Sequence, residues 1–287
     1  MACSVVQGQG IRMFAGTTLR SLGVPNVVLQ ERAMWYMRVH FVPSQETGGA
    51  TGTHYIVEHT NAIRMYGVSG SSDYNLIIEL LDDSSNWNVI NINLNAFGIS
   101  GGLYRFSQIC AEVITFNLAR PGEFSADYGT TAFIRINGWL VAKLVLPLGV
   151  YFSRLAGDLF FCNTADGTAP FLGILDDIAI TVSPPAATEN CDVLQRVDIP
   201  YNIPFLRPFP IGTTATGIRH YWSFDAADGW SGNTAIDLGS VGGWNMPFNQ
   251  SPTLVQGPVR VLSGGPIFYM RTQKFNPGLG VITHIPS

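Results

Sequence analysis

The feature that most constrains the fold of this chain is the alternation of apolar and polar residues in short segments between about residues 27 and 182. In the clearest segment, Ile90, Ile92 and Leu94 alternate with Asn91 and Asn93. Successive side chains of a β-strand point to opposite faces, so strict alternation indicates a strand with one buried face. This segment is therefore predicted to be a half-buried antiparallel strand.

Segments of this kind follow one another, separated by turn residues about every 8 to 12 positions. In one of them, Met37, Val39 and Phe41 share a face. The predicted strands are residues 35–42, 54–57, 62–68, 74–81, 86–94, 111–118, 131–137, 139–146, 159–162 and 174–182. Asn137-Gly138 lies between two of them, and both residues tolerate the positive φ angles of a two-residue hairpin turn. We predict an all-β fold, a two-sheet antiparallel jelly-roll sandwich.

The composition is poor in charge. Of 287 residues, 13% are charged and the net charge is −4, whereas an average soluble domain has about 25% charged residues. With 46% hydrophobic residues, the chain is too apolar to be disordered, and it is too acidic to be a general nucleic-acid binder. Lysine occurs only at Lys143 and Lys274. We therefore expect part of the surface to be buried in an assembly; the alternative is a secreted monomer with an uncharged polar surface.

Membrane, export and cysteine signals are few. The most apolar stretch, residues 139–152, is too short to span a membrane and contains Lys143. The first residues lack the basic and apolar regions of a signal peptide. We expect a protein made in the cytoplasm that stays there or leaves inside a particle.

Cys110 and Cys162 lie in apolar runs and no CxxC pair occurs, so we expect core cysteines, no structural metal and no cofactor.

The character of the sequence changes near residue 183. Residues 184–217 are rich in proline and in large apolar residues. Because proline at this density disfavours a central strand, we predict an extended arm that lies along a surface. The predicted organisation is residues 1–183 as the jelly roll, 184–217 as the arm, and 218–287 as strands that complete the jelly roll in cis or in a neighbouring subunit. The predicted assembly contacts are Phe205, Leu206, Phe209, Tyr221, Trp222 and Phe224.

Three segments resemble one known family. Residues 133–142 (FIRINGWLVA) resemble the Y-V-D-G hairpin of laminin-G-like domains. Residues 171–180 (FLGILDDIAI) resemble their closing G-x-I-D-D-V-x-I strand, and residues 35–43 (WYMRVHFVP) resemble their S-W-V-R-P strand. Over about residues 12–182 the chain is thus similar to the concanavalin A-like lectin/glucanase superfamily. The resemblance implies a two-sheet jelly roll of a kind that is also common in phage tail and capsid proteins.

The segment with which such domains usually open is displaced in this chain. Residues 221–229 (YWSFDAADG) and 234–239 (TAIDLG) resemble that opening, but they follow the main strands. Three explanations are open: the fold is circularly permuted, these strands complete a neighbouring subunit, or they belong to a truncated second domain. An unfinished jelly roll leaves an unpaired sheet edge, so the first two fit the physics better.

The catalytic patterns of related folds are incomplete here. Glucanases of the superfamily carry alternating acids on one strand, but Glu79 has no such partner, and residues 82–86 indicate a solvated turn. Residues 98–102 (GISGG) match a nucleophile elbow without a helical pattern after them. The H-x-x-x-E-H pattern at residues 54–59 resembles a zinc motif, but a regular strand would turn the second histidine away from the other two residues. We therefore expect no enzymatic activity.

Two groups of residues are candidates for binding. Asp176 and Asp177 match the family's acidic pair, and the resemblance implies calcium near the sheet rim; the alternative is an ordinary turn acid. Tryptophans in or beside polar turns offer ring faces on which a sugar can stack, and the alternative for them is packing at an interface or core rim. These tryptophans are Trp87, Trp230 and Trp244.

These features together predict a non-enzymatic structural protein of a virion, such as a phage tail or capsid decoration component. Its expected partners are further copies of itself and other virion proteins, and it would be made in the host cytoplasm. The alternative is an extracellular, lectin-like adhesin that binds surface glycans. We expect no nucleic-acid binding and no membrane insertion, and we predict no catalytic or cofactor-binding residue.

Overall fold

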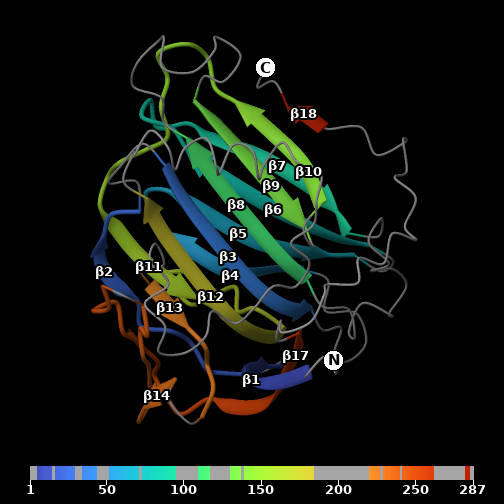
Figure 1. Ribbon diagram of the computed structural model, residues 1–287, viewed down its shortest axis with the longest axis vertical. Coiled ribbons are helices and arrows are strands. Elements are labelled where there is room, and N and C mark those ends of the chain that lie inside the picture. The colour runs from blue at the N-terminus through green and yellow to red at the C-terminus, as the bar shows by residue number, and fades with distance from the viewer. Residues whose placement is uncertain are drawn as a thin grey trace.

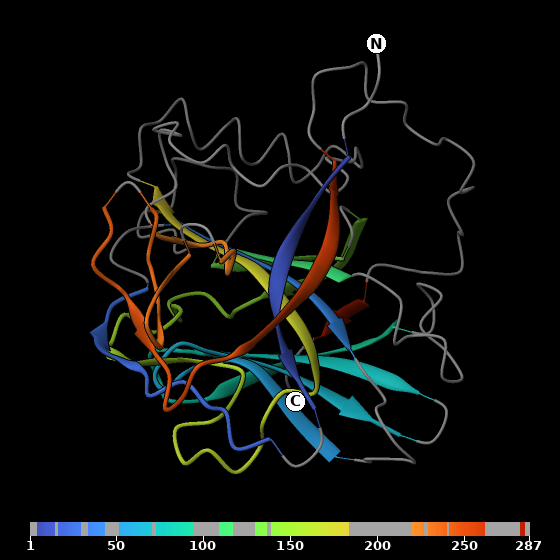
Figure 2. The same cartoon turned by 90° about the horizontal axis from the view of Figure 1, so that it is seen from below.

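The computed structural model describes residues 5–14, 17–29, 34–43, 52–70, 73–94, 109–116, 130–136, 139–183, 220–226, 229–239, 241–261 and 282–284. Within these ranges the chain forms two β-sheets, a small third sheet and no α-helix. Figure 2 shows the two main sheets as stacked layers. No helix long and apolar enough to cross a membrane occurs in the described part of the chain.

The larger sheet has nine strands and lies toward the viewer in Figure 1. Its main path runs β17-β1-β12-β3-β8-β9-β10-β18, and β13 pairs with β12 off this path. The bounds are β1 Val5–Met13, β3 Met34–Pro43, β8 Ile109–Phe116, β9 Thr131–Ile136, β10 Trp139–Val145, β12 Gly173–Ser183, β13 His220–Trp222, β17 Thr253–Val261 and β18 Ile282–His284. The pairing of β18 with β10 is parallel, and the other pairings in this sheet are antiparallel.

The smaller sheet has six antiparallel strands in the order β2-β11-β4-β5-β6-β7. The bounds are β2 Val24–Val27, β4 Gly52–His59, β5 Ile63–Ser69, β6 Tyr74–Leu81, β7 Trp87–Asn93 and β11 Gly157–Phe161. Along β5, buried and half-buried residues alternate strictly. Ile63 and Met65 point into the sandwich, whereas Arg64 and Tyr66 point outward.

One apolar core fills the space between the two sheets. Met37, Val39 and Phe41 of β3 are fully buried in it, as predicted, together with Ile63 and Met65 of β5. Burial of this apolar surface is the main stabilising contribution to the sandwich. The predicted all-β sandwich of antiparallel, jelly-roll type is confirmed.

The local predictions agree closely with the strands. The predicted segment at residues 74–81 coincides with β6, and β9 pairs with β10 around residues 137–138, with Ile136 opposite Trp139. The turn at residues 82–86 is present, but Asp82 is buried and not solvated. Its Oδ1 accepts backbone N–H groups of Ser84 at 2.9 Å and Asn86 at 2.8 Å, so the carboxylate closes the turn.

The C-terminal strands pair with the main sheet of the same chain. β17 runs beside β1 from Arg12 opposite Thr253 to Val5 opposite Val261, and Figure 2 shows the two ribbons side by side. β13 pairs with β12 through Ile178 opposite Trp222. Beside them lies the third sheet, formed by β14 Trp230–Ser231, β15 Thr234–Ala235 and β16 Met246–Pro247. In this arrangement β17 covers the edge of β1 in cis.

Three of the predicted assembly contacts are buried inside this chain. Tyr221 is 4% exposed, and Trp222 and Phe224 are fully buried. Trp222 and Phe224 pack edge to face on Phe161, at centroid distances of 4.9 and 6.4 Å. Because β13 completes the sheet within the chain, these side chains serve the core of their own sandwich. The other three, Phe205, Leu206 and Phe209, lie with the predicted arm outside the described residues.

Candidate functional site

The outward face of the six-stranded sheet carries a row of side chains that crosses five strands. The register places Phe160 of β11, Glu58 of β4, Arg64 of β5, Glu79 of β6 and Val89 of β7 opposite one another in turn. Directly opposed side chains on one face of a sheet lie close enough to touch. The three central residues therefore form a cross-strand ladder of negative, positive and negative charge.

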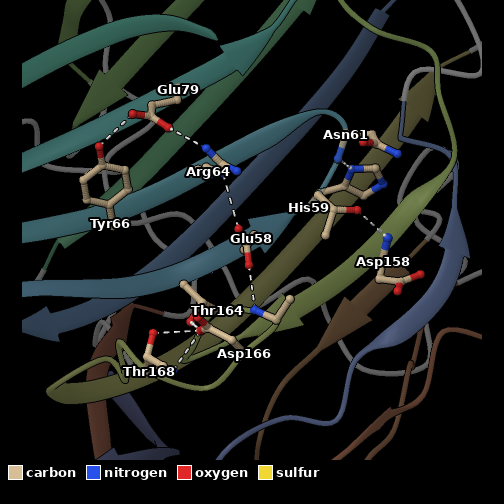
Figure 3. Close-up of polar contacts among 12 residues, drawn as sticks. Glu58, His59, Asn61, Arg64, Tyr66, Glu79, Asp158, Thr164, Asp166 and Thr168 are labelled. Carbon is tan, nitrogen blue, oxygen red and sulfur yellow. Dashed lines mark hydrogen bonds and ion pairs between the residues drawn. The ribbon is translucent and has the colours of Figure 1, made fainter. Parts of the chain in front are cut away.

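Arg64 links the two carboxylates of this ladder (Figure 3). Its Nε lies 3.3 Å from Oε1 of Glu58, and its Nη1 lies 3.5 Å from Oε2 of Glu79. The side chains of Glu58 and Glu79 are 8% and 15% exposed, and that of Arg64 is 32% exposed. Partial removal from water strengthens such attractions and also raises the cost of losing a partner.

The remaining oxygen of each carboxylate is also engaged. Oε2 of Glu58 accepts the backbone N–H of Ala165 at 2.8 Å, and Oε1 of Glu79 accepts the hydroxyl of Tyr66 at 2.8 Å. Both glutamates are thereby fixed in position by two contacts each. They act as positioning groups for the ring of Tyr66, the guanidinium of Arg64 and the turn around Ala165.

Aromatic rings flank the charged ladder. The rings of Tyr55 and Tyr66, opposite each other in β4 and β5, stack with centroids 4.8 Å apart and planes inclined by 23°. On the other side, the guanidinium carbon of Arg64 lies 4.1 Å from the centroid of the Trp87 ring. All three rings are half-buried, so each retains an accessible part. The face thus combines three aromatic rings with one cation and two carboxylates.

The tyrosine hydroxyls remain protonated at physiological pH. Burial raises the pKa of Tyr55 against the opposing effect of Arg64, and Glu79, Glu58 and Asp166 add smaller upward contributions. Burial, then the hydrogen bond to Glu79, raises the pKa of Tyr66 well above its ordinary value. Both hydroxyls are therefore available as neutral hydrogen-bonding groups.

A turn after β11 borders this face. Asp166 accepts hydrogen bonds from the hydroxyls of Thr164 and Thr168, the latter at 2.8 Å, and from the Thr168 backbone N–H at 3.0 Å (Figure 3). These bonds lower the pKa of Asp166 from 3.8 to about 2. Through the Ala165 N–H bond to Glu58, the turn is tied to the charged ladder. Asp166 is thus a fixed negative charge in a turn that is bonded to β4 at Glu58 and, through the Ala169 carbonyl, at the N–H of Tyr55.

An irregularity in β4 determines which side chains join the site. Tyr55 pairs with Tyr66 but Val57 pairs with Met65, so Ile56 is an extra residue in the strand. A β-bulge of this kind reverses the facing of the residues after it. Glu58 therefore points outward and His59 inward, on the same side as His54. The expectation that the second histidine faces away from His54 is wrong for this reason, whereas the expectation that it faces away from Glu58 is confirmed.

The predicted sugar-stacking tryptophans fall into two groups. Trp87 lies on the outward face, in contact with Arg64. Trp230 packs between Phe224 and Phe248 and donates its Nε1–H to the Phe224 carbonyl at 3.0 Å. Trp244 stacks on His220 with centroids 3.5 Å apart. Trp230 and Trp244 therefore lie with the C-terminal core, and the site includes Trp87 alone among the three.

The two candidate calcium ligands lie within the larger sheet, not at its rim. Asp176 and Asp177 are fully buried at the irregularity where β12 faces β3. Asp177 accepts the hydroxyl of Tyr221, and its other oxygen lies 3.5 Å from Nδ1 of His40. In the described part of the chain, no group of three or more His, Cys, Asp or Glu side chains is arranged to hold a metal ion.

Sequence reasoning missed Tyr55, Arg64 and Tyr66 as site residues. It considered Glu58 and Glu79 separately, each within a motif on its own strand. A usable signal was the alternation Arg64-x-Tyr66 within a predicted strand next to the one that carries Glu79. The bulge at Ile56 leaves no such local signal, so the complete row depends on strand register.

Comparison with known proteins gives similarity at the level of structure. Neither the protein-family models nor the curated proteins give a match. A protein of Bacteroides ovatus for which carbohydrate binding has been suggested aligns with a TM-score of 0.49 and 9% identity, over 90% of this chain and 62% of that one. The heptameric pentraxin of Limulus polyphemus aligns with a TM-score of 0.36 and 14% identity, over 60% and 75% of the two chains.

A phage protein is also among the similar structures. Tailspike protein 2 of an Escherichia coli O157:H7 bacteriophage aligns with a TM-score of 0.32 and 12% identity, over 71% of this chain and 29% of the tailspike. This chain thus spans less than two thirds of the Bacteroides and phage proteins. These similarities concern the fold, and the site has to be interpreted from its own residues.

Proposed function

We propose that the protein is a glycan-binding module and that the outward face of the six-stranded sheet is its binding surface. The observation that carries the proposal is the combination, on one face, of the Tyr55–Tyr66 pair and Trp87 with the Glu58–Arg64–Glu79 ladder. Small-ligand sites combine apolar rings with a few fixed polar groups that set orientation. A sugar ring has both an apolar C–H face and hydroxyl groups, so it matches such a surface.

The rigidity of the face supports this role. Both glutamates are held by two contacts each, and the stacked tyrosines fix each other's ring planes. Side chains that are already ordered lose little conformational entropy when a ligand binds. The surface is therefore suited to recognise a repeating, extended ligand without rearrangement.

We propose that this binding is not catalytic. Glycoside hydrolysis requires one carboxyl group that donates a proton and a second that acts as nucleophile or base. Here all four carboxylate oxygens of Glu58 and Glu79 already accept hydrogen bonds or pair with Arg64. A reducing-end assay on every bound glycan tests this point, and release of new reducing ends would contradict it.

The experiment that tests glycan binding is a glycan array followed by titration calorimetry on the best ligand. We expect saturable binding that falls about fivefold or more in Tyr55→Ala and Trp87→Ala, since loss of one stacking ring costs on the order of 1 kcal/mol or more. Phe14→Ala is the matched control, because Phe14 is an exposed aromatic residue that follows β1 of the other sheet. The absence of any bound glycan, or equal losses in all three variants, would refute the proposal.

A role as a particle component is the second candidate. It rests on the low charge of the chain and on Leu148 and Leu155, which are 95% and 62% exposed between β10 and β11. Exposed leucines of this kind fit a contact surface better than a solvated one. Light scattering on size-exclusion chromatography tests the role. We expect a closed oligomer that dissociates in Leu148→Gln/Leu155→Gln, and a monomeric parent chain would exclude self-assembly.

A further inference from the structure

The charge around the aromatic pair points to the class of glycan that this face accepts. We propose that the site binds uncharged glycans and rejects acidic ones, and that Asp166 is the residue that does most to set this selectivity. The inference rests on the proposed glycan-binding function and specifies its ligand. It follows from the number, the sign and the accessibility of the charges that face the ligand position.

Negative charges outnumber positive ones at this position. Glu58, Glu79 and the turn that carries Asp166 lie around Tyr55, and this turn is hydrogen-bonded to Glu58 and to the Tyr55 N–H. The cations are Arg64, between the two glutamates, and Arg20, which lies against Gly167 of the turn. Three acids against two arginines leave a local excess of one negative charge beside the stacked rings. A glycan with carboxylate or sulfate groups would meet a repulsive potential here, whereas an uncharged glycan would not.

Arg64 offsets only part of this repulsion for an incoming anion. Its guanidinium is already shared between Glu58 and Glu79, and the Trp87 ring lies 4.1 Å from its carbon atom. An acidic sugar would have to displace one of the two glutamates to form a bidentate pair with it. The displaced carboxylate would then be left partly buried without its cation, which is unfavourable.

Asp166 is the most accessible of the three acids. Glu58 and Glu79 are largely buried and share one cation, Arg64, whereas Asp166 is exposed and has no cation among its hydrogen-bond partners. Its three hydrogen bonds come from Thr164 and Thr168 and hold the carboxylate in its ionised form. Its charge is therefore constant over the physiological range and directed at solvent beside the site.

The test compares pairs of polymers with the same sugar backbone, of which one member is uncharged and the other carries carboxymethyl groups. Dextran and carboxymethyl-dextran form one pair, and hydroxyethylcellulose and carboxymethylcellulose form a second. Binding of each to the immobilised full chain is measured by biolayer interferometry at about 0.02 M and 0.5 M NaCl. The variant is Asp166→Asn, which keeps the acceptor oxygen. The matched control is Asp158→Asn, an exposed acid on β11 of the same sheet that contacts Asn26.

We expect the uncharged member of a bound pair to bind more tightly at low salt and the difference to shrink at high salt, since salt screens exposed charges. Asp166→Asn should reduce the preference by about two- to fivefold, which is the range for one exposed charge. Asp158→Asn should leave it unchanged. Equal binding of both members, or an unchanged preference in Asp166→Asn, would overturn the inference while glycan binding stands. If no polymer of either pair binds, and the array is also negative, the proposed function itself fails.

Discussion

The guanidinium of Arg64 and the indole of Trp87 are in contact although the two residues lie on strands that are not neighbours in the sheet. Arg64 lies on β5 and Trp87 at the start of β7, and β6 runs between them. The 4.1 Å separation between the guanidinium carbon and the ring centroid is a cation–π arrangement. With the two glutamates, the ring gives Arg64 a third fixed contact, so charge and aromatic surface form one unit.

Replacement of Arg64 by lysine tests this unit. An ammonium group is a compact point charge without the planar fork of a guanidinium, so it cannot contact Glu58, Glu79 and Trp87 at once. We expect Arg64→Lys to lower the free energy of unfolding by about 1–2 kcal/mol, and to weaken glycan binding. Urea denaturation measures the first effect. Arg154→Lys, at an exposed arginine, is the control, and equal midpoints for both variants would contradict the role of Arg64.

Gly67 is required for the packing of β5 against a neighbouring ring. A Cβ atom at Gly67 would overlap the hydroxyl and ring carbons of Tyr74, which is 1% exposed. We expect Gly67→Ala to destabilise the fold by about 1–3 kcal/mol, as is usual when a close-packed site is overfilled. Gly52→Ala on β4 is the matched control, because the nearest atom to its added Cβ is 3.8 Å away. Thermal melts of both variants give the comparison, and similar melting temperatures would disprove the prediction.

His59 makes stability depend on pH near neutrality. Burial lowers the pKa of His59 below 6.5, against the opposing effect of its backbone hydrogen bonds. Its Nε2 lies 2.8 Å from the Val27 carbonyl, and its Nδ1 accepts the N–H of Asn61 at 3.2 Å, so the neutral ring satisfies both partners. The unfolded chain therefore takes up a proton at a higher pH than the folded chain does.

The sign of this effect follows from proton linkage. Where the unfolded state binds more protons, stability rises with pH, so the protein loses stability as pH falls below about 6.5. We expect this slope to be smaller in His59→Gln, although that variant is less stable overall. Urea midpoints between pH 5 and 8 measure it. A parent chain whose stability is flat over this interval would show that His59 titrates normally.

Sequence patterns predict much of the fold because strands such as β5 and β7 alternate strictly between buried and more exposed residues. The prediction for β6 coincides with the strand, and β9 and β10 pair antiparallel as predicted, with Ile136 opposite Trp139. The candidate site was harder to predict because it depends on register between strands. The bulge at Ile56 turns Glu58 outward, and no residue pattern within β4 predicts this bulge. Trp87 was found because it stands alone beside a polar turn, whereas Arg64 and Tyr66 resemble ordinary surface residues of a strand.

Asp237 connects the C-terminal segment to the sandwich, and its ionisation makes the stability of the fold sensitive to acid. Its Oδ2 lies 2.7 Å from Nδ1 of His220 and accepts the Trp244 N–H at 3.0 Å. Its Oδ1 accepts the N–H groups of Tyr221 and Gly239, both at 3.0 Å. One carboxylate thus joins β13 to the loop before β16.

The protonation of Asp237 should be costly to the fold. Burial alone would raise its pKa, but the hydrogen bonds from His220 and the three backbone N–H groups outweigh burial and hold the pKa below 3.8. For an acid with a depressed folded-state pKa, the stabilising effect is complete above its unfolded-state pKa and is lost as pH falls through the folded value. The parent chain should therefore lose stability in acid, below about pH 4.

Asp237→Asn removes the charge and replaces one acceptor by a donor that faces other donors. We expect a loss of about 2–4 kcal/mol at pH 7, because a buried hydrogen-bond network is broken. The loss relative to the parent should shrink toward pH 3, where the parent's own carboxylate becomes protonated. Urea denaturation at pH 7, 5 and 3 tests both statements. The matched control is Asp73→Asn, an exposed acid in the β5–β6 connection. A constant difference between Asp237→Asn and the parent at all three pH values would show that the charge of Asp237 contributes nothing to the stability of the fold.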